Sequence, residues 1–125
     1  MTELSTVYIV DDDASVRRSL ERLMKSFGYT PVAFATVDEF LALPTLAASS
    51  CVIADVTMRG GTGVALAQAL QQRGDGLPVI LVTAHDTDEV RAAAKRCGVS
   101  AYFRKPVDDQ ALVDSIEWAL STRRL

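Results

Sequence analysis

Five short apolar runs recur along the 125-residue chain, and each is followed by a segment with the hydrophobic period of a helix. The runs predict strands at 6–10, 31–35, 51–54, 78–82 and 101–103. They are apolar throughout and do not alternate with polar residues, which is typical of parallel strands buried on both faces. Five such units with short connections predict an α/β fold, a doubly wound five-stranded parallel sheet with helices on both faces.

Helical stripes and capping residues fill the segments between the runs. The first stripe consists of Val16, Leu20, Leu23, Met24 and Phe27, and Gly28 follows as the expected residue beyond the helix end. Thr36 and Glu39 form a capping box that opens a short helix ended by Pro44. Later helices are expected after Gly63, after a cap at Asp86 or Thr87, and over 108–121, with Leu112, Val113, Ile116 and Leu120 inward.

Composition limits the class of protein. The length suits one domain over 1–125, and 49% hydrophobic residues can form a core without metals or disulfides. A net charge of −3 does not favour direct nucleic-acid binding. We expect a soluble, cytoplasmic protein, since no signal peptide or membrane span is apparent. Cys51 and Cys97 are expected as small apolar side chains and not as a disulfide.

Polar residues follow four of the five predicted strands. Three aspartates (Asp11 to Asp13) follow the first, and the others end at Asp55, Thr83 and Lys105. Because ligands of such sheets bind at the carboxyl ends of the strands, these side chains should converge on one rim. Two carboxylates about 4 Å apart repel by about 4 kcal/mol at an effective dielectric near 20, so the cluster calls for a cation. Mg²⁺, a hydroxyl and a lysine beside carboxylates indicate phosphoryl transfer.

The segments VYIVDDD, CVIADVTM, LVTAH and YFRKP occur in this order along the chain. Over essentially its whole length, the sequence therefore resembles the receiver domain of bacterial two-component response regulators. The strings DDDASVRRSL and TAH resemble the FixJ-type subgroup of that family in particular. The resemblance implies a flavodoxin-like receiver fold and a cis peptide bond between Lys105 and Pro106.

Carried over by position, the resemblance implies that Asp55 takes a phosphoryl group from the phosphohistidine of a sensor histidine kinase. It implies that Asp12 binds Mg²⁺ directly, Asp11 binds it through water, and the Thr57 carbonyl completes the protein ligands. Thr83 and Lys105 would bind phosphoryl oxygens. Tyr102 would change rotamer on activation and, with Thr83, would form the switch. The chain would be no enzyme in the ordinary sense, since it would catalyse only its own phosphorylation and dephosphorylation.

The implied output is control of a partner or an output domain through the face made by the fourth helix, the fifth strand and the fifth helix. A phosphorylation-dependent homodimer is one expected form of that control. Transcription is the expected target, with DNA contacted only through an output domain that these residues do not contain. No membrane partner is expected.

The loop after Asp55 departs from the usual pattern of the family. Met58 is followed by Arg59 and Gly60, where receivers usually have Met-Pro. We expect this change to loosen the loop and to add a positive charge near the pocket.

Several residues allow two interpretations. Asp13 suits helix capping better than metal binding. His85 could modulate the phosphoryl lifetime or simply lie at the surface, Tyr102 could be a core residue, and Trp118 could lie on a flank or at an interface.

Two rival functions remain for the whole chain. One is a small Mg²⁺-dependent phosphohydrolase of the haloacid-dehalogenase type, suggested by Asp11-x-Asp13. The other is a receiver-like module that binds partners without being phosphorylated.

Overall fold

A computed structural model describes residues 5–58 and 61–123 of the chain. Its main sheet has five parallel strands in the order β2-β1-β3-β6-β7. The strands are β1 Thr6–Val10, β2 Thr30–Phe34, β3 Ser50–Asp55, β6 Val79–Thr83 and β7 Ala101–Arg104. This confirms the predicted fold class. Each strand boundary lies within one residue of its predicted position. The pairing of β2 begins at Thr6↔Thr30, one residue before its predicted start at Pro31.

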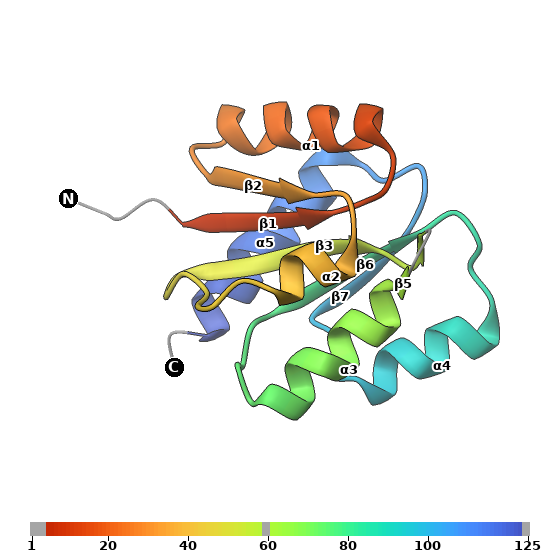
Figure 1. Cartoon of the computed structure of the whole chain (residues 1–125). Helices are drawn as coiled ribbons and strands as arrows, with labels where there is room; N and C mark the ends of the chain where they lie inside the picture. The colour runs from red at the N-terminus through yellow and green to blue at the C-terminus, as the bar shows by residue number, and fades with distance from the viewer. Residues whose placement is uncertain (1–4, 59–60, 124–125) are drawn as a thin grey trace.

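The helices form a layer on each face of the sheet (Figure 1). They are α1 Ala14–Ser26, α2 Val37–Leu41, α3 Gly63–Arg73, α4 Asp88–Arg96 and α5 Asp109–Arg123. Buried residues of α1 and α5 pack with Val7, Ile9 and Ile53 on one face. Buried residues of α2, α3 and α4 pack with Tyr8 and Val52 on the other face. Neighbouring residues of one strand thus enter different cores, which explains why the strands are apolar throughout.

Local signals placed most helix ends correctly. Asp13, Thr36 and Thr87 each cap a helix by accepting hydrogen bonds from backbone N–H groups, so the cap after β6 is Thr87 and not Asp86. Gly28 follows the first helix with a φ of +86°, a conformation that suits glycine. The short α2 ends at Leu41, and Pro44 lies shortly beyond its cap.

Two features differ from the sequence pattern. Phe27 was expected on the buried stripe of the first helix, but it is the C-cap residue and is 44% exposed. The helix ends there, and the ring lies beyond the last turn that faces the sheet. A two-stranded antiparallel pair, β4 Thr57–Met58 with β5 Gly61–Thr62, was not predicted, since two residues a strand are too few for a periodicity.

The remaining expectations concern exposed and apolar residues. Trp118 on α5 is 60% exposed, in agreement with a flank position. Cys51 is buried and Cys97 half-buried, and neither forms a disulfide within the described residues. None of the helices in the described part of the chain has the length and apolar character needed to cross a membrane.

Candidate functional site

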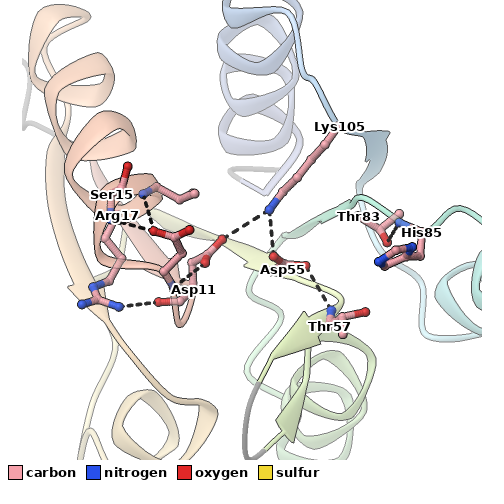
Figure 2. A network of polar contacts seen from close by, with 10 residues as sticks. Asp11, Ser15, Arg17, Asp55, Thr57, Thr83, His85 and Lys105 are labelled. Carbon is pink, nitrogen blue, oxygen red and sulfur yellow. Dashed lines mark hydrogen bonds and ion pairs between the residues drawn. The ribbon is translucent and has the colours of Figure 1, made fainter.

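The carboxyl edge of the sheet gathers the polar residues that follow its strands. Asp55 ends β3 and Thr83 ends β6, while Asp11 and Lys105 directly follow β1 and β7. The strand order reverses beside β1, which has β2 on one side and β3 on the other. Ligands of doubly wound sheets bind at such a point. Figure 2 shows Asp11, Asp55 and Lys105 pointing toward one another there.

Lys105 lies between two carboxylates from different strands. Its Nζ is 2.8 Å from Asp55 Oδ2 and 3.7 Å from Asp11 Oδ2. Burial lowers the pKa of Lys105, but the hydrogen bond and charge of Asp55, with the charge of Asp11, outweigh it and leave that pKa raised. The ammonium is therefore positively charged at neutral pH. The Lys105–Pro106 bond is cis, which confirms the expectation from the family resemblance.

Asp11 is the buried carboxylate of the site, with 4% of its surface exposed. Its Oδ1 accepts a hydrogen bond from the Asp13 N–H at 2.9 Å, and its backbone carbonyl accepts one from Arg17 Nη1 at 2.8 Å. Burial raises the pKa of Asp11, and the hydrogen bond from Asp13 and the charge of Lys105 only partly oppose this. Without a further cation, ionisation of Asp11 therefore destabilises the folded protein.

Both oxygens of Asp55 have hydrogen-bond donors. The Thr57 N–H donates to Oδ1 at 3.0 Å, and the Lys105 ammonium donates to Oδ2. Gly63 also packs closely against the backbone at the end of this strand. A Cβ at Gly63, the first residue of α3, would lie 2.6 Å from the Asp55 carbonyl oxygen. The Asp55 carboxylate is therefore held in one orientation on a rigid strand.

The carboxylate oxygens of the site suit a magnesium ion that is bound by few protein groups. Across the described residues, no three or more His, Cys, Asp or Glu side chains form a group able to hold a metal ion. Asp12, expected as a direct ligand, is exposed, whereas Asp11 is buried beside Asp55. Mg²⁺ usually takes one or two protein carboxylates and completes its shell with water and phosphate oxygens. The pair Asp11 and Asp55 fits that requirement, and the Lys105 ammonium supplies their counter-charge.

Thr83 and His85 lie on the other side of Asp55 (Figure 2). The Thr83 side chain is buried, and its Oγ1 accepts a hydrogen bond from the His85 N–H at 3.0 Å. His85 itself is exposed. The predicted phosphoryl ligand Thr83 is thus on the rim, but it is engaged with its own loop.

A polar network around Asp86 was not predicted. The half-buried Tyr102 donates its hydroxyl to Asp86 Oδ1 at 3.0 Å, and Arg91 on α4 pairs with Asp86 Oδ2. The hydrogen bond from Arg91 and that from Tyr102 lower the pKa of Asp86. The sequence indicates only a helix cap at Asp86, because no local pattern connects this residue with Tyr102 on β7. Arg59 and Gly60, the departure from the family loop, lie outside the described residues.

Comparison with known proteins agrees with this geometry. Residues 7–117 match the family described as response regulator receiver domain. The chain is similar to the transcriptional regulatory protein TdiR of Thauera aromatica, with 37% identity over 120 residues, covering 96% of this chain and 53% of TdiR. It is 33% identical over 121 residues to FixJ of Bradyrhizobium diazoefficiens, covering 96% of this chain and 58% of FixJ.

Solved structures give the same result. A CheY-like receiver domain protein from Methanospirillum hungatei JF-1 superposes with a TM-score of 0.90 at 25% identity, covering 98% of both chains. The chain thus belongs to the response regulator receiver domain family. It is the receiver domain of a two-component response regulator, and it resembles the FixJ-type members. It spans little more than half the length of TdiR and FixJ.

Proposed function

We propose that Asp55 accepts a phosphoryl group from the phosphohistidine of a sensor histidine kinase and so switches an output. The observation that carries this proposal is the Asp55 carboxylate at the switch point of the sheet, 2.8 Å from the Lys105 ammonium and beside the buried Asp11. A carboxylate on a rigid strand is a nucleophile that needs no general base.

In the proposed reaction, one carboxylate oxygen of Asp55 attacks phosphorus while the P–N bond to the donor histidine breaks. The imidazole nitrogen leaves with the bonding electrons and is protonated by solvent. Positioning and charge neutralisation do most of the work in such a transfer. The Thr57 N–H orients the Asp55 carboxylate through Oδ1. The Lys105 ammonium, which donates to Oδ2, would bind an oxygen of the transferred phosphoryl group.

Mg²⁺ is the proposed cofactor. Asp12 and Asp55 would hold it directly and Asp11 through water, and the Thr57 carbonyl would complete the protein ligands. When bound, Mg²⁺ adds positive charge that neutralises the phosphoryl oxygens. The raised pKa of Asp11 supports this assignment, because a buried carboxylate beside a second one is stabilised by a cation.

Thr83 and Tyr102 form the proposed switch. A phosphoryl group on Asp55 adds acceptor oxygens, and the Thr83 hydroxyl moves toward them to donate its proton while its oxygen still accepts from the His85 N–H. That movement shifts the loop that carries Asp86, to which Tyr102 is bound. The face formed by α4, β7 and α5 then changes, and we propose that it tunes self-association and output. Sedimentation with and without beryllofluoride tests this step, and identical profiles for wild type and Thr83→Ala would contradict it.

The partners follow from the family. The proposed donor is a histidine kinase, and the output is transcription, because TdiR and FixJ are transcriptional regulatory proteins. DNA would be contacted only through an output domain outside these residues. The proposed location is the cytoplasm, where thiols such as those of Cys51 and Cys97 stay reduced.

Incubation with Mg²⁺ and acetyl phosphate tests the central claim. We expect one adduct of about 80 Da, the mass of a phosphoryl group, on the intact protein by mass spectrometry. Asp55→Asn should abolish it. The matched control Asp38→Asn, at an exposed position on α2, should keep it. Absence of an adduct on the wild type would instead favour a receiver-like module that works without phosphorylation. Release of inorganic phosphate at many turnovers from a separate phosphate ester would favour the phosphohydrolase.

A further inference from the structure

An arginine on the first turn of α1 holds the backbone of the acidic loop that follows β1. Arg17 Nη1 donates to the Asp11 backbone carbonyl at 2.8 Å, across six positions of the chain. The Arg17 side chain is half-buried. Figure 2 shows it reaching back from α1, with Asp11 between it and the Lys105 ammonium. Lys105 therefore faces the carboxylate of Asp11, whereas Arg17 binds the backbone of the same residue.

The place of Arg17 in the helix does not favour the helix itself. The N-cap of α1 is Asp13, and the backbone N–H of Arg17 donates to the Asp13 carbonyl, so Arg17 lies in the first turn. A cation in the first turn opposes the partial positive charge at the amino end of a helix. Holding a long side chain in one place also costs rotamer entropy. These two costs point to a role for Arg17 at the Asp11 carbonyl.

The carbonyl that Arg17 binds belongs to the peptide that joins Asp11 to Asp12. A trans peptide is planar, so its oxygen and the Cα of the next residue move as one rigid unit. A hydrogen bond to this oxygen therefore restricts where the Asp12 side chain can lie. On its other side, Asp11 is fixed by its own N–H, which donates to the Phe34 carbonyl of β2 at 3.1 Å. The backbone that carries both aspartates is thus bonded on either side of Asp11.

Positioning and charge make opposite predictions for Arg17. Groups that hold metal ligands in place contribute to metal affinity, and loss of one typically weakens binding about 10- to 100-fold. Loss of a nearby cation acts the other way, because it lowers the repulsion between the protein and Mg²⁺. Removal of Arg17 should therefore weaken Mg²⁺ binding if its contact matters, and strengthen it if only its charge does.

We propose that Arg17 is a positioning residue that holds the loop of Asp11 and Asp12 in the geometry that binds Mg²⁺. This inference rests on the proposed function and adds a residue that acts on the metal through the backbone of its ligands. Arg17→Gln should raise the Kd for Mg²⁺ about tenfold. At saturating Mg²⁺, the Asp55 adduct should form at the wild-type rate, because Arg17 contacts the backbone of Asp11 and not Asp55.

The test measures the free energy of urea unfolding of each variant, first in EDTA and then at rising Mg²⁺. Mg²⁺ that binds the folded chain raises this free energy by RT ln(1 + [Mg²⁺]/Kd). The increment therefore gives Kd, and the value in EDTA separately gives the stability of the metal-free chain. A purely structural role would lower the value in EDTA and leave the increment unchanged.

Two further variants separate the contact from the charge. Arg18→Gln is the matched control, since Arg18 is the next residue of α1, is exposed, and loses the same charge. Its Kd should equal that of the wild type or lie slightly below it. Arg17→Lys keeps the charge but not the planar donor group, so it should raise Kd by a smaller factor than Arg17→Gln.

The outcomes separate this inference from the proposed function. A Kd for Arg17→Gln equal to that of the wild type, or lower, would overturn the inference and leave phosphorylation of Asp55 intact. An equal rise for Arg17→Gln and Arg18→Gln would also overturn it, because the contact would then not be the cause. If Arg17→Gln does not fold, an unchanged Kd for Arg17→Lys has the same meaning. A wild type without any Mg²⁺ increment would contradict the proposed metal site, and this inference with it.

Discussion

Asp11 and Asp86 lie in two loops at the same edge of the sheet, yet their surroundings shift their pKa values in opposite directions. Asp11 is buried near a second carboxylate, and burial raises its pKa. Asp86 pairs with the exposed Arg91 side chain, and hydrogen bonds from Arg91 and Tyr102 lower its pKa. One half of the rim therefore retains a carboxylate that disfavours folding when ionised, and the other half gains from its charge. The first half is suited to a cation and the second to holding a loop in place.

We call the part of the rim around Asp11 and Asp55 the acidic half. A substitution that disturbs the packing beneath Asp55 should produce the largest effect. Gly63→Ala would place a Cβ 2.6 Å from the Asp55 carbonyl oxygen and 2.8 Å from Leu81 Cδ2. Overpacking of this kind costs about 1–3 kcal/mol. We expect the free energy of unfolding in urea to fall by about that amount, with slower phosphorylation of Asp55.

Gly74→Ala is the matched control for this variant. Gly74 has a φ of +72°, but a Cβ added there would meet nothing within 4 Å, so only backbone strain of about 1 kcal/mol applies. Equal losses for the two variants would show that the packing beneath Asp55 does not hold the acidic half.

The sign of the Asp11 contribution is the next test. Asp11→Asn removes a buried charge and keeps an oxygen for the Asp13 N–H, so unfolding at neutral pH without metal should cost roughly 1 kcal/mol more. A raised pKa contributes stability below the pKa of the unfolded chain and loses it as the pH rises through the folded value. The advantage of Asp11→Asn should therefore vanish on acidification.

Urea unfolding of wild type and Asp11→Asn in EDTA, between about pH 7 and pH 3, measures this difference. Saturating Mg²⁺ should reverse the order by stabilising the wild type more. A variant less stable than the wild type at neutral pH in EDTA would show that Lys105 overcompensates for the burial of Asp11.

Asp86→Asn should have the smallest effect and the opposite sign. A lowered pKa contributes stability above the pKa of the unfolded chain and loses it as the pH falls through the folded value. The variant should be slightly less stable than the wild type at neutral pH and equal to it in acid. Because Arg91 is 62% exposed, the loss should be smaller than either effect above.

A double variant, Asp86→Asn with Arg91→Gln, isolates the pair. If the two side chains act together, the double variant should be no less stable than Asp86→Asn alone. Strictly additive losses would instead indicate that Arg91 contributes through other contacts.

Local patterns were sufficient to predict the elements and the residues at their ends. The apolar runs placed the strands within one residue, and the caps at Asp13 and Thr36 were correct. Both depend on neighbours a few positions away, the strands through a continuous run of apolar residues and the caps through hydrogen bonds to the next turn. The order of strand ends also placed Asp55, Thr83 and Lys105 on one rim, since parallel strands share an edge.

The electrostatic character of the rim depends on contacts far apart in sequence. Lys105 reaches Asp55 across 50 positions, and Tyr102 reaches Asp86 across 16. Which of Asp11 and Asp12 is buried follows from how the end of β1 meets β3, and the pattern of three aspartates is silent on it. Burial and distance arise from the packing of whole elements, so no local period encodes them.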